Sequence, residues 1–140
     1  MTAPEIALVT ASFRKLAPIS DQVAALFYAR LFELDPSLRQ MFHSDMETQG
    51  RKLMHMLGVA VESLEQFESL TPSVRQMGVR HLRYGVRESH YATVGSALLW
   101  TLQKGLGSEF TPATKAAWSA TYALLANTMI AGARAPAVAA

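Results

Sequence analysis

The sequence predicts an all-α protein, and three features of the chain support this class. Apolar residues recur at every third or fourth position through most of the 140 residues, which is the spacing of one helix face. Residues that cap helices stand before several of these segments, and proline follows the cap at Asp35, Thr71 and Thr111. The alternation of apolar and polar residues that is typical of a strand persists nowhere over a useful length.

The first half of the chain predicts three helices and one short helical turn. Thr2 and Glu5 form a capping-box pattern, in which each side chain can accept a hydrogen bond from the backbone of the other residue. A second capping-box pattern, Ser44-Asp45-Met46-Glu47, starts a long helix with one apolar stripe. In chain order, we expect a helix from Thr2 to about Pro18, a helix from Ile19 to about Leu34, a turn from Asp35 to Phe42 and a helix from Ser44 to about Phe67.

The second half of the chain predicts three further helices. The first starts at the Thr71-Pro72 cap, carries His81 and stops at Gly85, which can adopt the left-handed conformation. Another helix begins around Ser89, and the last one starts at the Thr111-Pro112 cap. The buried stripe of the last helix is Trp118, Tyr122, Leu125 and Met129.

The composition of the chain limits where it works and what it binds. Half of its residues are hydrophobic, so it can bury one core as one domain, which we place in residues 1–133, with a disordered tail at 134–140. No apolar run approaches the ~20 residues of a membrane span, and no signal-peptide pattern is present, so we expect a cytoplasmic protein without a membrane partner. The formal net charge is +2 and the basic residues are scattered, which does not favour binding to nucleic acid.

The chemistry that side chains alone can perform is also restricted. The chain has no cysteine, which excludes disulfides, thiolate zinc sites and a cysteine nucleophile. Its four histidines form no H-E-x-x-H or Glu-x-x-His pattern, and no glycine-rich phosphate loop is present. Any catalysis would therefore depend on a cofactor. The histidines are His43, His55, His81 and His90.

Five motifs follow one another along the chain in a characteristic order and spacing. They are Leu26–Phe32, the Asp35–Phe42 turn, Gln49–Met54, Gly78–Val86 and Ser89–Tyr91. Together they resemble a bacterial single-domain globin and the globin domain of flavohaemoglobins, from about residue 3 to 132. The resemblance implies a globin fold in residues 1–133, in which three helices lie over three others around a haem b.

One side of the haem site implied by this resemblance is centred on His81. The resemblance assigns the iron to its Nε2, and the other ring nitrogen can donate to a backbone carbonyl of the preceding turn. Met77, one turn earlier, is expected on the same haem face, and Val94 is expected to contact the haem. Tyr91 matches a tyrosine of flavohaemoglobins that approaches the ligating histidine.

The sequence departs from the flavohaemoglobin pattern at Ala133. In that family a glutamate of the last helix completes the hydrogen-bond network around the ligating histidine, and Ala133 occupies the matching position. The departure argues against a strongly electron-donating, peroxidase-like His81. A site that holds a ligand on a neutral imidazole is the remaining interpretation.

The other side of the site is implied to contain Tyr28, Phe42, Gln49 and Leu53. Phe42 would stack on the porphyrin edge and Leu53 would restrict the space above the iron. Tyr28 and Gln49 would donate hydrogen bonds to bound dioxygen, because that ligand carries partial negative charge; each bond to a charged acceptor contributes roughly 1.5–3 kcal/mol. As alternatives, Tyr28 is a core residue with its hydroxyl at the surface, and Gln49 is solvated.

Two basic residues complete the implied site. Lys52 and Arg80 could reach the haem propionates, although both positions are equally compatible with solvated charges. His43 could approach the haem edge, whereas His55 points away from the pocket and His90 is expected to be exposed at a helix start.

The resemblance implies reversible binding of dioxygen and other diatomic ligands such as NO or CO, for storage, scavenging or transport. Nitric oxide dioxygenase activity is the second hypothesis, and it would require a separate reductase as a partner. A sensor would need an output partner. In a haem-free interaction module, Tyr28, Gln49 and His81 would be packing residues.

Overall fold

Six α-helices form the fold in the computed structural model, which describes residues 1–135. No strand occurs in this part of the chain, so the all-α prediction is confirmed. The elements are α1 (Ala3–Leu16), α2 (Ser20–Leu34), α3 (Met46–Glu62), α4 (Phe67–Arg83), α5 (Glu88–Leu106) and α6 (Pro112–Arg134), with turns of 3₁₀ helix at Ala17–Ile19, Pro36–Met41, Leu64–Gln66 and Gly107–Glu109.

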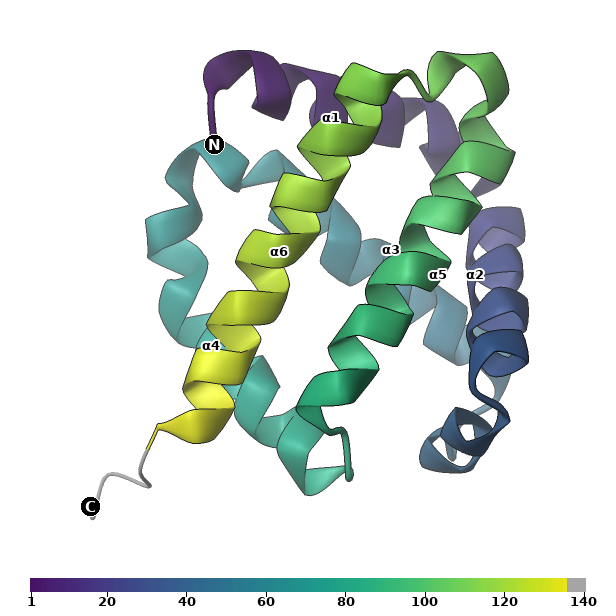
Figure 1. Ribbon diagram of the computed structural model, residues 1–140, viewed down its shortest axis with the longest axis vertical. Helices are drawn as coiled ribbons and strands as arrows, with labels where there is room; N and C mark the ends of the chain where they lie inside the picture. Colours follow the sequence, from purple (N-terminus) through teal and green to yellow (C-terminus); the bar gives the residue numbers. More distant parts are fainter. Residues whose placement is uncertain (136–140) are drawn as a thin grey trace.

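The helices are arranged in layers that cross one another. In Figure 1, α5 and α6 run along the front, α3 crosses behind them and α1 covers one end. α4 packs chiefly on α6, whereas α2 packs chiefly on α5 and α3. The largest fully buried side chain is that of Trp118 in α6, whose indole N–H donates to Ser12 of α1 at 2.8 Å.

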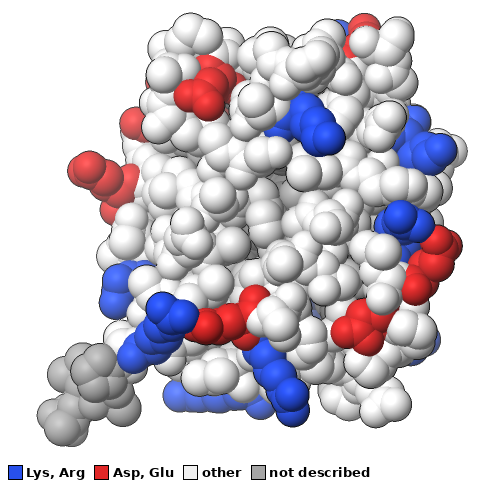
Figure 2. All heavy atoms as spheres, viewed as in Figure 1, with Lys and Arg blue, Asp and Glu red and all other residues white. Residues whose placement is uncertain are grey.

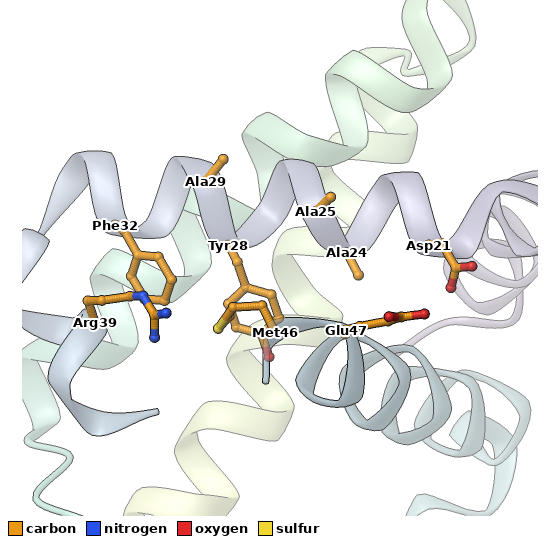
Figure 3. A pocket seen from close by; sticks show the side chains of 10 residues that line it. Asp21, Ala24, Ala25, Tyr28, Ala29, Phe32, Arg39, Met46 and Glu47 are labelled. Carbon is orange, nitrogen blue, oxygen red and sulfur yellow. The ribbon is translucent and has the colours of Figure 1, made fainter. Parts of the chain in front are cut away.

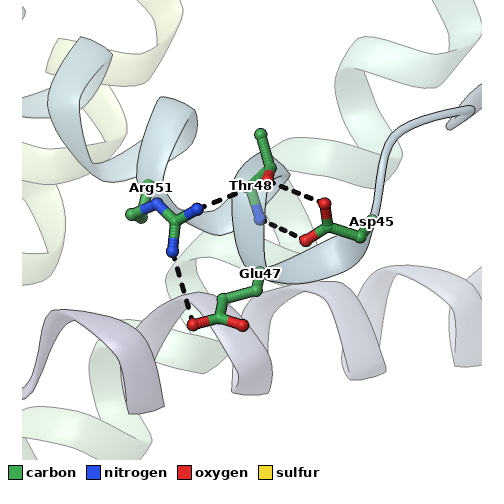
Figure 4. A network of polar contacts seen from close by, with 4 residues as sticks. All are labelled: Asp45, Glu47, Thr48 and Arg51. Atoms are coloured by element: carbon green, nitrogen blue, oxygen red, sulfur yellow. Dashed lines mark hydrogen bonds and ion pairs between the residues drawn. The ribbon is translucent and has the colours of Figure 1, made fainter.

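Most of the predicted caps are confirmed, and the cap of α3 moves by one residue. The predicted start was Ser44, but Asp45 is the capping residue: its carboxylate accepts the Thr48 N–H at 2.9 Å and the Thr48 hydroxyl at 2.8 Å (Figure 4). A carboxylate is a stronger acceptor than a serine hydroxyl, so it takes the position. Arg51 joins the network through Glu47 and Thr48.

The start of α4 differs more from the prediction. The helix begins at Phe67, and Thr71 and Pro72 lie inside it. The Thr71 hydroxyl donates backwards to the Phe67 carbonyl at 3.4 Å instead of capping the residues that follow. Pro72 removes only one hydrogen bond so close to the helix start, and Phe67 and Leu70 pack on an apolar cluster that includes residues of α6.

Backbone contact joins α4 to α6 around two glycines. A Cβ atom at Gly78 would lie 1.9 Å from the carbonyl oxygen of Met129, and a Cβ atom at Gly132 would lie 2.2 Å from that of Arg75. Neither position has room for a side chain. At the end of α4, Gly85 adopts a φ of +94°, which confirms the left-handed stop.

The last helix continues through Arg134, although the sequence places this residue in the predicted tail. Arg134 forms a two-pronged ion pair with Glu88 at the start of α5. Residues 136–140 of the predicted tail lie outside the described residues. Among residues 1–135, no helix is both long and apolar enough to cross a bilayer.

Candidate functional site

The candidate site is a pair of adjoining hollows between the helices. An inner cavity of about 180 Å³ lies among α2, α3, α4, α5 and α6, and its walls are almost entirely apolar. An outer cleft of about 610 Å³ adjoins it and carries the polar side chains. The two share six residues: Tyr28, Phe42, Leu53, Met56, His81 and Val86.

All ten predicted site residues line one or both of these hollows. Tyr28, Phe42, Leu53 and His81 line both, Tyr91 and Val94 line the inner cavity, and Gln49, Lys52, Met77 and Arg80 line the outer cleft. The fold therefore brings together residues from five segments that are far apart in the sequence. The roles assigned to them remain predictions.

His81 is held in one orientation by its own helix. Its Nδ1 lies 2.7 Å from the Met77 carbonyl oxygen, one turn earlier in α4. Since a carbonyl can only accept, Nδ1 carries the proton and the Nε2 lone pair is free. Burial lowers the pKa of His81. The hydrogen bond to Met77 raises it and the neighbouring charge of Arg80 lowers it, and the net shift is downward. The ring is therefore neutral at pH 7.

The protonation of His81 predicts a pH dependence of the apoprotein. Because the folded pKa lies below the ordinary 6.5, the unfolded chain takes up a proton first as the pH falls, and stability decreases below about pH 6.5. We expect the loss to be small, because the ring keeps partial contact with solvent, which screens its charge. Urea unfolding at pH 7.5 and 5.0 measures the change in the free energy of unfolding. The decrease should be smaller in His81→Gln than in the wild type. An equal decrease in the two proteins would show that protonation of His81 is not the cause.

Tyr28 is buried where α2 meets the first turn of α3. Only 8% of the residue is exposed, and burial raises the pKa of its phenol to about 12. Its hydroxyl donates to the Gln49 carbonyl oxygen at 3.4 Å, which is long for a bond of this kind. A hydroxyl held this weakly can turn to a better acceptor inside the pocket.

The Tyr28 ring is fixed by aromatic neighbours. It meets Phe42 edge-on at 5.4 Å between centroids, and Phe32 contacts Phe42 at 5.5 Å. A separate groove of about 420 Å³ lies between α2 and α3, and Figure 3 shows Tyr28 and Met46 among its walls. Tyr28 lines this groove as well as both hollows of the site, so it forms part of the wall between them.

Gln49 is brought close to Tyr28 by the small residues beside it. A Cβ atom at Gly50 would lie 2.9 Å from the Cβ of Ala24, so α3 and α2 cross closely at this point. The Gln49 side chain lines the outer cleft, and Leu53 follows one turn later on the same face of α3. Gln49, Leu53 and Tyr28 therefore share the lining of the outer cleft.

Among residues 1–135, the groove beside Tyr91 is lined by one carboxylate, that of Glu88, which is paired with an arginine. Tyr91 and Ala133 both line a groove of about 320 Å³ outside the inner cavity. The acidic residue of that groove is Glu88, and it pairs with Arg134. The Tyr91 backbone carbonyl instead accepts a bond from the buried Tyr122 hydroxyl at 2.7 Å.

Two further residues, which sequence reasoning did not place at the site, line the hollows. His90, expected to be exposed, is half-buried and lines the inner cavity, while its Nδ1 accepts the Arg87 N–H at 2.9 Å. Met56 lines both hollows, and its position three residues after Leu53 on an amphipathic helix was the available signal. His43 lines the outer cleft as expected, and His55 is exposed outside it.

These features fit a haem. A haem needs an apolar cavity with one metal ligand, and the inner cavity and the outer cleft together provide this space, with His81 lining both. Lys52 and Arg80 place two cations at the outer cleft, where propionates could pair with them. Among residues 1–135, no group of three or more His, Cys, Asp or Glu could hold a metal ion.

Comparisons with known proteins agree in family and fold. The family model described as Globin matches residues 25–129. A flavohemoprotein of Bordetella parapertussis is 33% identical over 134 residues, which are 93% of this chain; the chain spans about a third of the length of such relatives, 33% in this case.

Two solved structures are similar over almost the whole chain. An engineered carbene transferase, which is described as a candidate nitric oxide dioxygenase of Rhodothermus marinus, is 30% identical, with a TM-score of 0.81 over 91% of this chain and 89% of that one. A bacterial globin of Campylobacter jejuni is 25% identical, with a TM-score of 0.82 over 94% and 96%. The predicted globin fold is thereby confirmed.

Proposed function

Because the chain belongs to the globin family, we propose that it holds a haem b and reversibly binds dioxygen and other diatomic ligands. The observation that supports this proposal is the anchored His81, which lines the same apolar cavity as the buried Tyr28. The haem would supply the iron at which such ligands bind. A cytoplasmic location remains a prediction.

The residues of the chain have distinct parts in this proposal. His81 holds the iron from one side, and the Met77 carbonyl keeps its ring in place. Phe42, Leu53 and Val94 exclude water from the haem faces, which strengthens every polar contact inside the pocket. On the side away from His81, the Tyr28 hydroxyl and the Gln49 amide donate to a bound ligand.

Titration of the apoprotein with haemin tests the proposal directly. We expect one equivalent to bind and to produce a sharp Soret band, with a carbon monoxide complex of the reduced protein that is typical of histidine ligation. A protein that stays colourless after haemin is added and excess removed would overturn the proposal and leave the packing interpretation of His81.

Tyr28→Phe tests the ligand side of the site. Losing one hydrogen bond to a charged acceptor in a water-poor pocket costs roughly 1.5–3 kcal/mol, so dioxygen should dissociate about ten- to a hundredfold faster. Stopped-flow displacement of dioxygen by carbon monoxide measures this rate. Ser73→Ala is the control, because it removes an exposed hydroxyl from a residue that lines neither hollow, and it should leave the rate unchanged.

Nitric oxide dioxygenase activity is the second candidate, favoured by the likeness to the Rhodothermus marinus protein. Converting NO and dioxygen to nitrate takes one electron per turnover, which a separate reductase would supply. Sustained NO consumption with NADH and cell extract, absent in His81→Ala, would favour it. If NO consumption stops after one equivalent per haem with every extract tried, the protein is not a nitric oxide dioxygenase, and ligand binding remains as the function.

A further inference from the structure

Methionines gather around the candidate site. The chain has seven of them, and five line at least one of three hollows whose walls include Tyr28: the inner cavity, the outer cleft and the groove between α2 and α3. Within residues 1–135, Met1 and Met54 line none of these hollows. The five that do are Met41, Met46, Met56, Met77 and Met129. The fold therefore collects thioethers from one turn and three helices at this place.

Met56 has the most central position among them. It lines both the inner cavity and the outer cleft, and it is only half-buried. The other residues shared by these two hollows have aromatic, imidazole or aliphatic side chains. Within residues 1–135, the soft and polarisable sulfur of Met56 is therefore the one thioether that belongs to both hollows.

Met77 adds a second thioether from another helix. It lines the outer cleft, is half-buried, and lies one turn before His81 in α4. Met56 shares α3 with Gln49 and Leu53, which line the same cleft. The two thioethers therefore come from the two helices that carry the predicted iron ligand and the predicted residues on the opposite side of the haem.

We propose that Met56 and Met77 are modification sites, at which hydrogen peroxide in the pocket converts the thioether to a sulfoxide; the inference rests on the proposed function. One oxygen atom passes from peroxide to sulfur: the O–O bond breaks, an S–O bond forms, and the other oxygen leaves as water with both protons. The sulfur loses two electrons and the peroxide gains them, so no further reductant is required. When bound, the haem would supply the iron that activates peroxide. Methionine sulfoxide can be reduced back to methionine by dedicated reductases, so the sites could be restored.

The thioethers would spare the tyrosine on which ligand binding depends. Burial raises the pKa of the Tyr28 phenol to about 12, so the phenol keeps its proton at pH 7. A neutral phenol gives up an electron less readily than a phenolate. A thioether carries no proton and accepts an oxygen atom directly. Met56 and Met77 should therefore react before Tyr28.

The approach of peroxide does not depend on charged side chains. Hydrogen peroxide is uncharged at pH 7, so the fields of Lys, Arg, Asp and Glu do not steer it. On the face shown in Figure 2, these side chains lie mostly around the edges. Ionic strength should therefore have little effect on which methionines are oxidised.

Mass spectrometry of each methionine tests the proposal. The apoprotein and the haem-loaded protein are treated with a few equivalents of hydrogen peroxide and then digested. In the apoprotein, oxidation should follow exposure, so Met1, which is 45% exposed, should react first. In the haem-loaded protein, Met56 and Met77 should react before Met1, although a haem in the hollows would shield them from bulk solvent. This reversal of the order is the expected result.

Met54 is the matched control within the same helix. It lies two residues before Met56, is also half-buried, and packs on the main apolar core, so it should stay unmodified. In a second measurement, the double variant Met56→Leu, Met77→Leu should lose its Soret absorbance faster than the wild type at equal peroxide. Met54→Leu should lose it at the wild-type rate. Leucine keeps the size and apolarity of methionine, so all variants should fold.

Three results would overturn the inference: oxidation of Met1 before Met56 and Met77 in the haem-loaded protein, equal oxidation of Met54 and Met56, or equal loss of Soret absorbance in the double variant and the wild type. A wild-type protein without a Soret band after haemin is added would instead refute the proposed function, and the inference with it.

Discussion

His81→Ala is expected to lower haem affinity by at least roughly a hundredfold, because it removes the bond between protein and iron. Residues that only hydrogen-bond to a metal ligand and orient it already change the affinity for the metal about ten- to a hundredfold. Removing the ligand itself should therefore have a larger effect. The apolar walls would still attract the porphyrin, so weak binding with an altered spectrum should remain. Haem transfer to an excess of apomyoglobin, followed by absorbance, measures the loss.

The matched control for His81→Ala is His55→Ala. His55 lies on α3, is exposed and lines neither hollow of the site, so its removal should leave haem transfer unchanged. Added imidazole should restore the Soret band of His81→Ala by entering the space left behind, and should have no effect on His55→Ala. Wild-type haem retention in His81→Ala would show that another side chain, such as His90, ligates the iron.

Local chemistry explains which parts of the fold were predictable from the sequence. Thr2, Asp35 and Thr111 cap their segments as predicted, because a cap depends on residues within one turn. Gly85 stops α4 for the same reason. The candidate site residues were predicted from the resemblance of several motifs to those of bacterial globins. In the fold, all of them line two adjoining hollows.

Contacts between distant segments explain what could not be predicted. Apolar periodicity shows which face of α4 is buried, but it does not show which helix that face packs against. The sequence near Thr71 therefore did not indicate that α4 begins earlier, at Phe67, where Phe67 and Leu70 pack on the cluster shared with α6. His90 was misplaced because its capping bond and its place in the inner cavity depend on how α5 meets the other helices.

The backbone contact between α4 and α6 makes Gly78→Ala the most destabilising single change that we predict. Alanine is the better helix former by about 1 kcal/mol, so propensity alone favours the variant. The new Cβ would lie 1.9 Å from the Met129 carbonyl oxygen, and backbone cannot rotate away as a side chain can. The helices must separate, and we expect the free energy of unfolding to fall by about 3 kcal/mol, the upper part of the range for overpacking.

Gly58→Ala is the matched control, in the interior of α3. A Cβ atom there would lie 3.5 Å from the Phe13 ring, an ordinary contact distance, so this variant should be unchanged or up to about 1 kcal/mol more stable. Urea unfolding of both apoproteins measures the two effects, and equal stabilities would show that the helices can adjust without cost. Because Gly78 lies one turn before His81, separation of α4 from α6 should also displace the imidazole, and haem should leave Gly78→Ala faster than Gly58→Ala.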